Sequence, residues 1–368
     1  MTELWLWVGF LGLVFIMLAL DLGVFNRKAH VMGIREALSW TAVWIVMALA
    51  FNVGVYFIYE YDLAGISEHY HNGVSVGGKT AAFEFLVGYL VEKSLSLDNI
   101  FVISLIFSFF AVPQIYQHRV LFWGILGALI LRGLMIWGGS ALIARFEWTI
   151  YVFAFLLLYT ALKMLFHKSE NIHPDQNPVV RLARKFMPVS SGIEGEHFFT
   201  RIDGRLAMTP LFLALIVVET SDVLFAVDSI PAIFGITHDP FLVFTSNIFA
   251  LLGLRSLYFA LAALINAFRY LKTSLIVILL YVSAKMIFGA AYEEFIHENG
   301  LKDIITLFSL GVIVVAMAGG ILASIYIPKK NDLTASQWIS AYRDEAKAAK
   351  ELREQKRQQA LANRNKRK

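Results

Sequence analysis

The chain has 368 residues, of which 58% are hydrophobic and only 16% are charged, and its mean hydropathy is +0.64. Soluble globular domains carry about 25% charged residues, so this composition predicts an integral membrane protein. The net charge of +4 is concentrated in the segment 329–368 and the remainder is close to neutral, so we expect no nucleic-acid partner. The chain has no cysteine, which excludes disulfides, thiolate metal sites and cysteine nucleophiles.

Long apolar runs follow one another through most of the chain. A bilayer core about 30 Å thick needs about 20 residues of helix. The runs that meet this length are 4–25, 37–59, 81–111, 119–144, 148–166, 208–236, 240–266, 273–291 and 303–327. No small-residue cleavage site follows the first run, so we interpret it as a retained span. We expect an all-α polytopic membrane protein with about nine transmembrane helices over residues 1–328, then a basic cytoplasmic tail over residues 329–368.

The charges between the runs indicate an orientation. Basic residues such as Arg27 and Arg119 follow the odd-numbered runs, whereas the connections after the even-numbered runs are acidic or short, as at Asp62 and Glu294. The positive-inside rule then places the N-terminus outside and the C-terminus in the cytoplasm. The connection 168–206, which contains prolines and many charges, is predicted to be a cytoplasmic linker.

The sequence contains an internal repeat. An acid followed six residues later by aspartate and then by a small polar residue occurs in residues 92–99 (EKSLSLDN) and again in residues 222–229 (DVLFAVDS). ALILR (128–132) resembles LLGLR (251–255), and YTALKMLF (159–166) resembles YVSAKMIF (281–288). Each unit has three spans, so the second enters the membrane from the opposite side. We expect an inverted 3+3 repeat, with unit one at about 81–167 and unit two at about 208–291, a pattern typical of secondary transporters.

Ionisable residues occur within the apolar runs. Each costs at least about 2.5 to 3.5 kcal/mol in the hydrocarbon, so these residues must be paired, protonated or bound to a cation. The acids are Asp21, Glu92, Asp98, Glu219, Asp222 and Asp228, and the bases are Arg132, Lys163, Arg255 and Lys285. The excess of negative charge would be balanced by a divalent cation or by protons. We interpret the arginines first as structural ion pairs, and leave open whether the lysines snorkel to an interface and whether Asp21 completes the site.

Helix geometry constrains which acids converge. At about 100° per residue, Glu92 and Asn99 share a face, whereas Asp98 lies about 240° round from Glu92 and Asp228 is displaced in the same way from Asp222. Pro231 can break its helix. We therefore expect local unwinding near Asp98 and Asp228, with freed carbonyls as further ligands.

The predicted site offers only oxygen ligands. All nine histidines lie in connections or at the ends of runs. Carboxylate, amide and hydroxyl oxygens suit hard or borderline cations such as Mn²⁺, Ca²⁺ and Mg²⁺ better than zinc or copper. The candidate ligands are Asp98, Asp228, Glu92, Asp222, Asn99, Glu219 and Ser229. No organic cofactor is expected. An intramembrane enzyme with paired aspartates stays an alternative, although catalysis does not require an inverted repeat.

Residues 91–102 (VEKSLSLDNIFV) and 218–233 (VETSDVLFAVDSIPAI) resemble the signature segments of the TerC family, named for tellurium resistance. The resemblance extends from residue 20 to about residue 325 and is closest to the Alx-type manganese exporters of the LysE-like transporter superfamily. It implies a bacterial inner-membrane protein that exports Mn²⁺ as its transported substrate, with the acids of the two segments as ligands. Apart from the resemblance, we expect protons as partners, because the carboxylates must be neutralised when empty, and membrane lipids at the basic tail. A metal-delivery or assembly factor for exported metalloproteins, without net transport, is the alternative. The resemblance does not cover the tail beyond Lys329.

Overall fold

The computed structural model describes residues 2–23, 33–63, 76–146, 148–166, 177–190, 192, 195–202, 204–261, 270–292 and 302–326. Its elements are α1 (Thr2–Gly23), α2 (Ile34–Glu60), α3 (Gly78–Phe109), α4 (Gln114–Arg145), α5 (Thr149–Phe166), α6 (Pro178–Phe186), β1 (Phe199–Ile202), β2 (Arg205–Met208), α7 (Pro210–Phe234), α8 (Pro240–Leu252), α9 (Leu254–Leu261), α10 (Leu271–Ala291) and α12 (Lys302–Tyr326).

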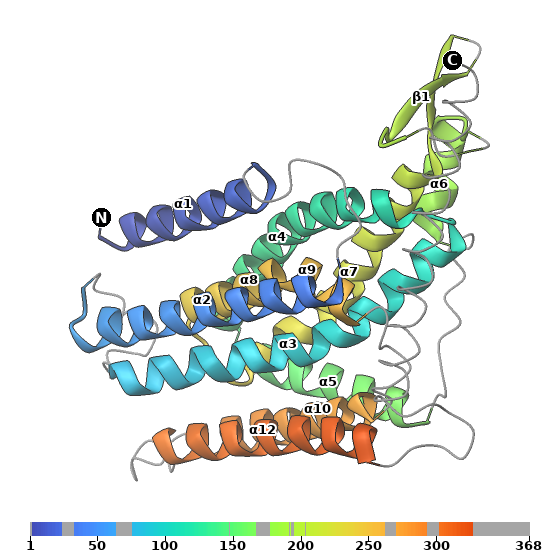
Figure 1. Cartoon of the computed structure of the whole chain (residues 1–368). Coiled ribbons are helices and arrows are strands. Elements are labelled where there is room, and N and C mark those ends of the chain that lie inside the picture. Colours follow the sequence, from blue (N-terminus) through green and yellow to red (C-terminus); the bar gives the residue numbers. More distant parts are fainter. Residues whose placement is uncertain are drawn as a thin grey trace.

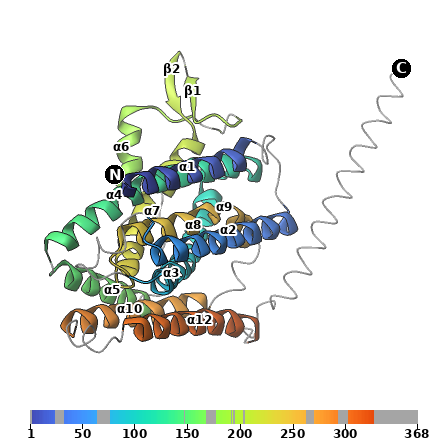
Figure 2. The same ribbon diagram turned by 90° about the vertical axis from the view of Figure 1, so that its left-hand side faces the viewer.

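The long helices form a bundle around α3 (Figure 1). Helix α3 packs against α2, α7, α8 and α12, while α5 packs against α10, which in turn packs against α12. Helix α1 lies on one side of the bundle and α12 on the opposite side (Figures 1 and 2). Helix α3 is therefore in a position to hold polar side chains away from the outer surface.

Each predicted apolar run except 240–266 coincides with one helix, with ends that differ by a few residues. Six helical segments in the described part of the chain are long and apolar enough to cross a membrane, and α1 and α10 contain shorter apolar stretches, Leu4–Ala19 and Thr273–Gly289. Large apolar side chains such as Trp137 (74% exposed) and Val315 (71% exposed) cover the outer surface, as expected for contact with lipid. The structure is that of a polytopic helical membrane protein, and the count of about nine spans stays a prediction.

The predicted run 240–266 is not one continuous helix. It is divided at Gly253 into α8 and α9. The Lys93 ammonium donates a hydrogen bond to the carbonyl of Ala250 (3.2 Å), which in an unbroken helix would accept from the backbone N–H of Leu254. A Cβ at position 253 would lie 2.7 Å from Lys93 Nζ, so glycine gives this side chain room at the break.

The linker between the two predicted repeat units contains regular structure. Asn177 caps α6, because its Oδ1 accepts from the backbone N–H groups of Val179 (2.9 Å) and Val180 (3.4 Å). Strands β1 and β2 form an antiparallel ribbon in which Phe199 pairs with Met208, and Gly204 in its turn has φ +77°. The prediction of an all-α fold is therefore wrong for this segment. An Asp-Gly dipeptide such as the one at 203–204 of the sequence is typical of hairpin turns, so the sequence contained this signal.

Candidate metal site

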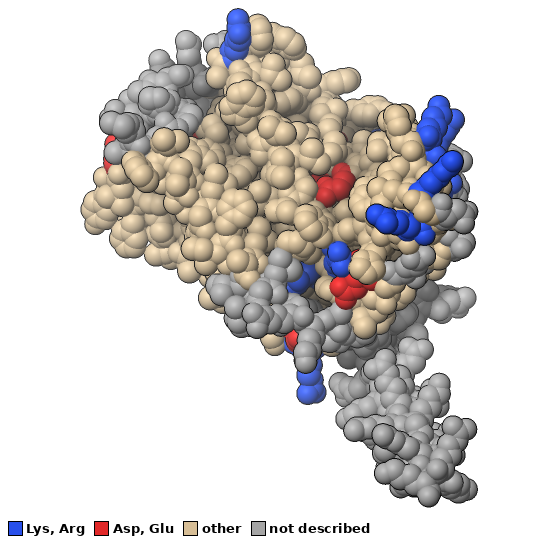
Figure 3. All heavy atoms as spheres, turned by 90° about the horizontal axis from the view of Figure 1, so that it is seen from above, with Lys and Arg blue, Asp and Glu red and all other residues tan. Residues whose placement is uncertain are grey.

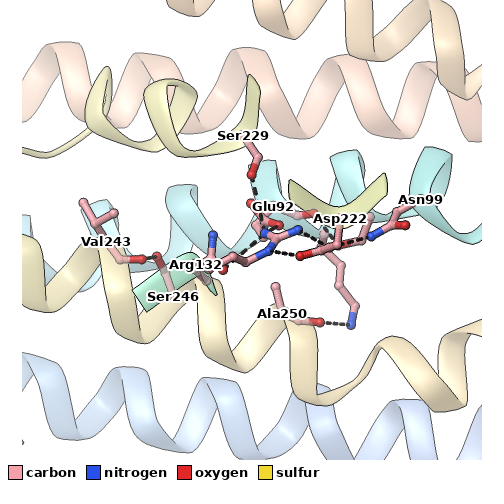
Figure 4. Close-up of polar contacts among 11 residues, drawn as sticks. Glu92, Asn99, Arg132, Asp222, Ser229, Val243, Ser246 and Ala250 are labelled. Atoms are coloured by element: carbon pink, nitrogen blue, oxygen red, sulfur yellow. Dashed lines mark hydrogen bonds and ion pairs between the residues drawn. The ribbon is translucent and has the colours of Figure 1, made fainter. Parts of the chain in front are cut away.

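Arg132 of α4 lies at the centre of a buried polar cluster. Its side chain is only 2% exposed. The guanidinium forms a bidentate ion pair with Asp222 of α7, from Nε to Oδ2 (3.0 Å) and from Nη2 to Oδ1 (2.8 Å). Its Nη1 also pairs with Glu92 of α3. Figure 4 shows the Arg132 side chain reaching between these two carboxylates.

Polar side chains complete the cluster. Arg132 Nη1 lies 3.2 Å from Asn247 Oδ1 and 3.4 Å from Ser229 Oγ, and Asn99 donates through Nδ2 to Asp222 Oδ1 (2.9 Å). All of these residues are buried. Burial of ions is costly unless they are paired with good geometry, and the bidentate Arg132–Asp222 pair provides that geometry. We name Glu92, Asn99, Arg132, Asp222, Ser229 and Asn247 the Arg132 cluster.

Two oxygens of the Arg132 cluster are not used by the hydrogen bonds within it. Glu92 Oε2 and Asn99 Oδ1 are buried and have no hydrogen-bond partner among the described residues. Asn99 and Asp222 also line a small recess between α3, α4 and α7, with room for about one water molecule. The cluster therefore retains acceptor capacity after the arginine has been bound.

Glu219 lies one helical turn before Asp222 on α7 and is half-buried. Its carboxylate sits against Gly127 of α4, where any Cβ would overlap it. Its Oε2 has no hydrogen-bond partner in the described part of the structure. Gly127 is thus required for the close approach of a carboxylate that the sequence analysis assigned to the site.

Asp228 lies apart from the Arg132 cluster. It is half-buried and accepts a hydrogen bond from Thr160 Oγ1 of α5 (2.8 Å). Six residues along a helix turn a side chain by about 240°, so Asp228 faces α5 while Asp222 faces Arg132. The predicted ligand Ser229, seven residues after Asp222, faces Arg132 instead.

The predicted unwinding of the two signature helices is wrong. Helix α3 is continuous from Gly78 to Phe109, and α7 is continuous from Pro210 to Phe234 with Pro231 inside it. Pro231 is in the last turn of α7, so the missing N–H affects only the carbonyl four residues earlier. The side chains of Asp98 and Asp21 lie outside the described residues.

The remaining predicted charges have different environments. Arg255 is 4% exposed, Lys285 is half-buried and Lys163 is exposed. The exposure of Lys163 agrees with a side chain that snorkels to an interface.

Asn247 and Thr160 were not predicted from the sequence. Asn247 follows Ser246 within an apolar run, and this polar pair was a usable signal. Thr160 lies in the YTALKMLF segment, which served only to identify the repeat.

The side chains that the structure describes do not assemble a complete metal coordination shell in this conformation. Among the described residues, no group of three or more His, Cys, Asp or Glu side chains lies close enough to hold a metal ion. Arg132 holds Glu92 and Asp222, and Asp228 is turned toward α5. The cluster is chemically an arrangement of carboxylate, amide and hydroxyl oxygens in which one guanidinium faces two carboxylates.

Comparison with known proteins identifies the family. The sequence profile of the integral membrane protein TerC family matches residues 77–332. The chain belongs to the TerC family. Both signature segments, and with them every residue of the Arg132 cluster, lie within the matched region. No solved structure matches the chain.

Several bacterial TerC relatives are similar over most of their length. A membrane protein of Myxococcus xanthus is 50% identical over 281 residues, which is 76% of this chain and 82% of the relative. An Escherichia coli K12 protein, provisionally named membrane-bound redox modulator Alx, is 45% identical over 291 residues, which is 78% of this chain and 87% of the relative. A Rickettsia bellii membrane protein is 39% identical over 306 residues, which is 83% of this chain and 95% of the relative.

Proposed function

We propose that this TerC protein is an exporter of divalent metal ions in the bacterial inner membrane, with Mn²⁺ as its substrate. The observation that carries the proposal is the Arg132 cluster, in which two carboxylates and several neutral oxygens are buried where α3, α4, α7 and α8 meet. A buried excess of carboxylate over guanidinium needs a further positive charge. Oxygen ligands without nitrogen or sulfur suit a hard or borderline cation such as Mn²⁺.

The packing supports an inverted repeat. In the proposed alignment α3, α4 and α5 match α7, α8–α9 and α10. Helix α3 packs on α8 as α7 packs on α4, and α5 packs on α7 as α10 packs on α3. A two-fold axis that exchanges the units would relate each of these contacts to its partner.

The contacts within the Arg132 cluster are also compatible with a two-fold axis that exchanges the two repeat units. Glu92 matches Asp222 in the repeat, and Asn99 matches Ser229. Glu92 and Ser229 both approach Arg132 Nη1, and Asn99 binds Asp222. Asp222 thus binds the polar residue of the opposite unit directly, whereas Glu92 and Ser229 are joined through Arg132. This arrangement favours a site between two units that rock against one another, the usual basis of alternating access.

The proposed mechanism assigns different roles to the acids. Arg132 acts as an internal counter-cation that holds Glu92 and Asp222 while the substrate is absent. In a second conformation that brings them together, Asp98, Asp228 and Glu219 bind the ion, with the unused oxygens of Glu92 and Asn99 as further ligands. When the ion leaves, protons neutralise these carboxylates, because ionised acids are costly in the hydrocarbon. Export would thus be coupled to proton uptake, with the N-terminus outside and the C-terminus in the cytoplasm.

The name of the E. coli relative suggests a redox role. This chain has no cysteine, so it has no thiol for disulfide exchange. We therefore propose transport rather than thiol redox chemistry. A metal-delivery factor without net transport stays the second candidate, because the same oxygens could hold an ion for transfer to another protein.

Substitution of the two matched aspartates tests the proposal. Asp98→Asn and Asp228→Asn should each abolish manganese tolerance in cells that depend on this protein, while abundance in the membrane stays unchanged. Asp62→Asn is the matched control, since Asp62 is exposed outside the helices and asparagine tolerates its positive φ of 44°. Normal manganese efflux by either aspartate variant would contradict the proposal.

A further inference from the structure

The linker module, which we define as α6 with the ribbon β1–β2, projects from the bundle. Figures 1 and 2 both show it extending sideways beyond α1 and α4, across the direction in which the long helices run. If those helices cross the membrane, a module that extends in this direction lies over lipid beside the bundle rather than over the bundle itself.

The module is firmly attached at its base. Val180 of α6 is completely buried, and α6 packs on α7. Arg119 of α4 forms an ion pair with Glu196 (3.3 Å), and Phe199 packs on Phe212 of α7 with ring centroids 4.5 Å apart. Its position relative to the ends of α4 and α7 is therefore defined by direct contacts.

Helix α6 has an exposed apolar face. Val179, Leu182 and Phe186 are spaced by three and four residues, so they share one side of the helix. Their exposed fractions are 42%, 53% and 77%. Val180 on another side makes the contact with the bundle, so this apolar face is not covered by the described part of the chain.

Basic side chains flank the apolar face. Arg181, Arg184 and Lys185 are all exposed. At about 100° per residue, Lys185 lies beside Leu182, and Arg181 and Arg184 lie farther round the helix. The ribbon adds Arg201 and Arg205, also exposed. In Figure 3 one group of Lys and Arg side chains lies at the right-hand end of the molecule, which carries the module, and others lie at the upper and lower edges.

We propose that the linker module binds anionic lipid headgroups of the membrane in which the protein is embedded. Leu182 and Phe186 enter the boundary between headgroups and acyl chains, and Arg181, Arg184 and Lys185 bind lipid phosphates. An apolar face next to a basic face is the pattern of helices that lie in a membrane interface, and the sideways projection places this one beside lipid. This inference is independent of the ion that the protein transports.

The absence of cysteine makes a direct test simple. The full chain carrying Val179→Cys is labelled with bimane and placed in nanodiscs of phosphatidylcholine alone, or of phosphatidylcholine with phosphatidylglycerol. Both contain lipids with a nitroxide quencher in the headgroup region. Quenching should be stronger with the anionic lipid. Arg181→Gln, Arg184→Gln and Lys185→Gln should each lower the ratio of bound to unbound module by about fivefold, as expected for one basic residue near an anionic surface.

Matched controls keep the test decisive. Lys79→Gln and Arg145→Gln remove exposed charges elsewhere on the molecule and should leave the quenching unchanged. High salt should reduce quenching of the unsubstituted module, which tests the proposal without any charge variant. Equal quenching in neutral and anionic nanodiscs would overturn it. If the label were shielded from solvent in native membranes but not in anionic nanodiscs, that result would also overturn the proposal and would indicate a protein partner.

Discussion

At the residue scale, Arg132 explains how two acids are accommodated in the middle of the bundle. Its guanidinium binds Asp222 with two parallel hydrogen bonds and pairs with Glu92. Removal of one partner from such a buried network leaves an uncompensated charge, which costs about 3 to 5 kcal/mol.

Arg132→Met should therefore lower the unfolding temperature sharply and reduce abundance in the membrane. The additional substitutions Glu92→Gln and Asp222→Asn should restore much of this loss, because they remove the charges that Arg132 neutralises. Thermal denaturation in detergent measures both effects. If Arg132→Met were as stable as the unsubstituted protein, the assigned role of Arg132 would be wrong.

Gly127 allows Glu219 to approach α4. A methyl group at position 127 would overlap the Glu219 carboxylate, so Gly127→Ala should displace it and reduce manganese efflux on the order of tenfold or more, since misplacement of a functional group by a small distance is costly. Gly138→Ala is the control on the same helix, because a Cβ there meets nothing within 4 Å. That variant should keep full efflux and gain stability from better helix propensity. Equal efflux by the two variants would exclude a role for the position of Glu219.

At the element scale, the start of α8 depends on a buried carboxylate. Asp239, in the connection before α8, is completely buried and accepts from the backbone N–H groups of Phe241 (2.8 Å) and Leu242 (3.3 Å). Tyr59 of α2 donates its hydroxyl to the other carboxylate oxygen (2.5 Å). Burial raises the pKa of Asp239 to about 6, although these hydrogen bonds lower it and the nearby Glu84 raises it further.

Tyr59→Phe should therefore destabilise the protein in a pH-dependent way. The folded-state pKa of Asp239 lies above the unfolded value of 3.8, so its contribution to stability is fully present below pH 3.8 and is lost as the pH rises through about 6. Loss of the Tyr59 hydrogen bond to the ionised carboxylate should cost about 1.5 to 3 kcal/mol at pH 8 but about 0.5 to 1.5 kcal/mol at pH 5.

Unfolding temperatures at pH 5 and pH 8 measure this difference. Tyr61→Phe is the control, because the Tyr61 side chain is 67% exposed at the end of the same helix. An equal loss of unfolding temperature at both pH values for Tyr59→Phe would show that the hydrogen bond to Asp239 does not carry the effect.

The existence of the long helices could be predicted because they are apolar runs between charged connections, whereas the short, charged α6 gave no such signal. The division at Gly253 could not be predicted, since it depends on Lys93 reaching the Ala250 carbonyl from another helix. The continuity of α7 through Asp228 was also not predictable from Pro231 alone, because a proline near a helix end can be tolerated when only one backbone hydrogen bond is lost.

At the scale of the whole molecule, the sequence identified both acidic segments but not which of their residues meet. The seven-residue spacing of Glu92 and Asn99, and of Asp222 and Ser229, places each pair on one face. Which face turns inward depends on how α3 and α7 rotate against α4 and α8. The position of Arg132 between the two segments, and the contribution of Asn247, therefore required the tertiary structure.

The proposed inverted repeat connects the residue, the element and the whole molecule. It predicts that the two signature helices play equivalent roles, and the exchange of partners between Glu92, Ser229, Asp222 and Asn99 is compatible with that prediction. If two such units rock against one another, the motion would carry a bound ion from one side of the membrane to the other.

The most direct test is the flux of Mn²⁺ through purified protein in proteoliposomes, with and without a pH gradient. We predict saturable Mn²⁺ flux that becomes faster when a proton gradient drives protons in the direction opposite to the Mn²⁺ flux. Asp228→Asn should abolish this flux, and Asp62→Asn should transport normally. Binding of Mn²⁺ without any flux would contradict the account and would favour a metal-delivery factor.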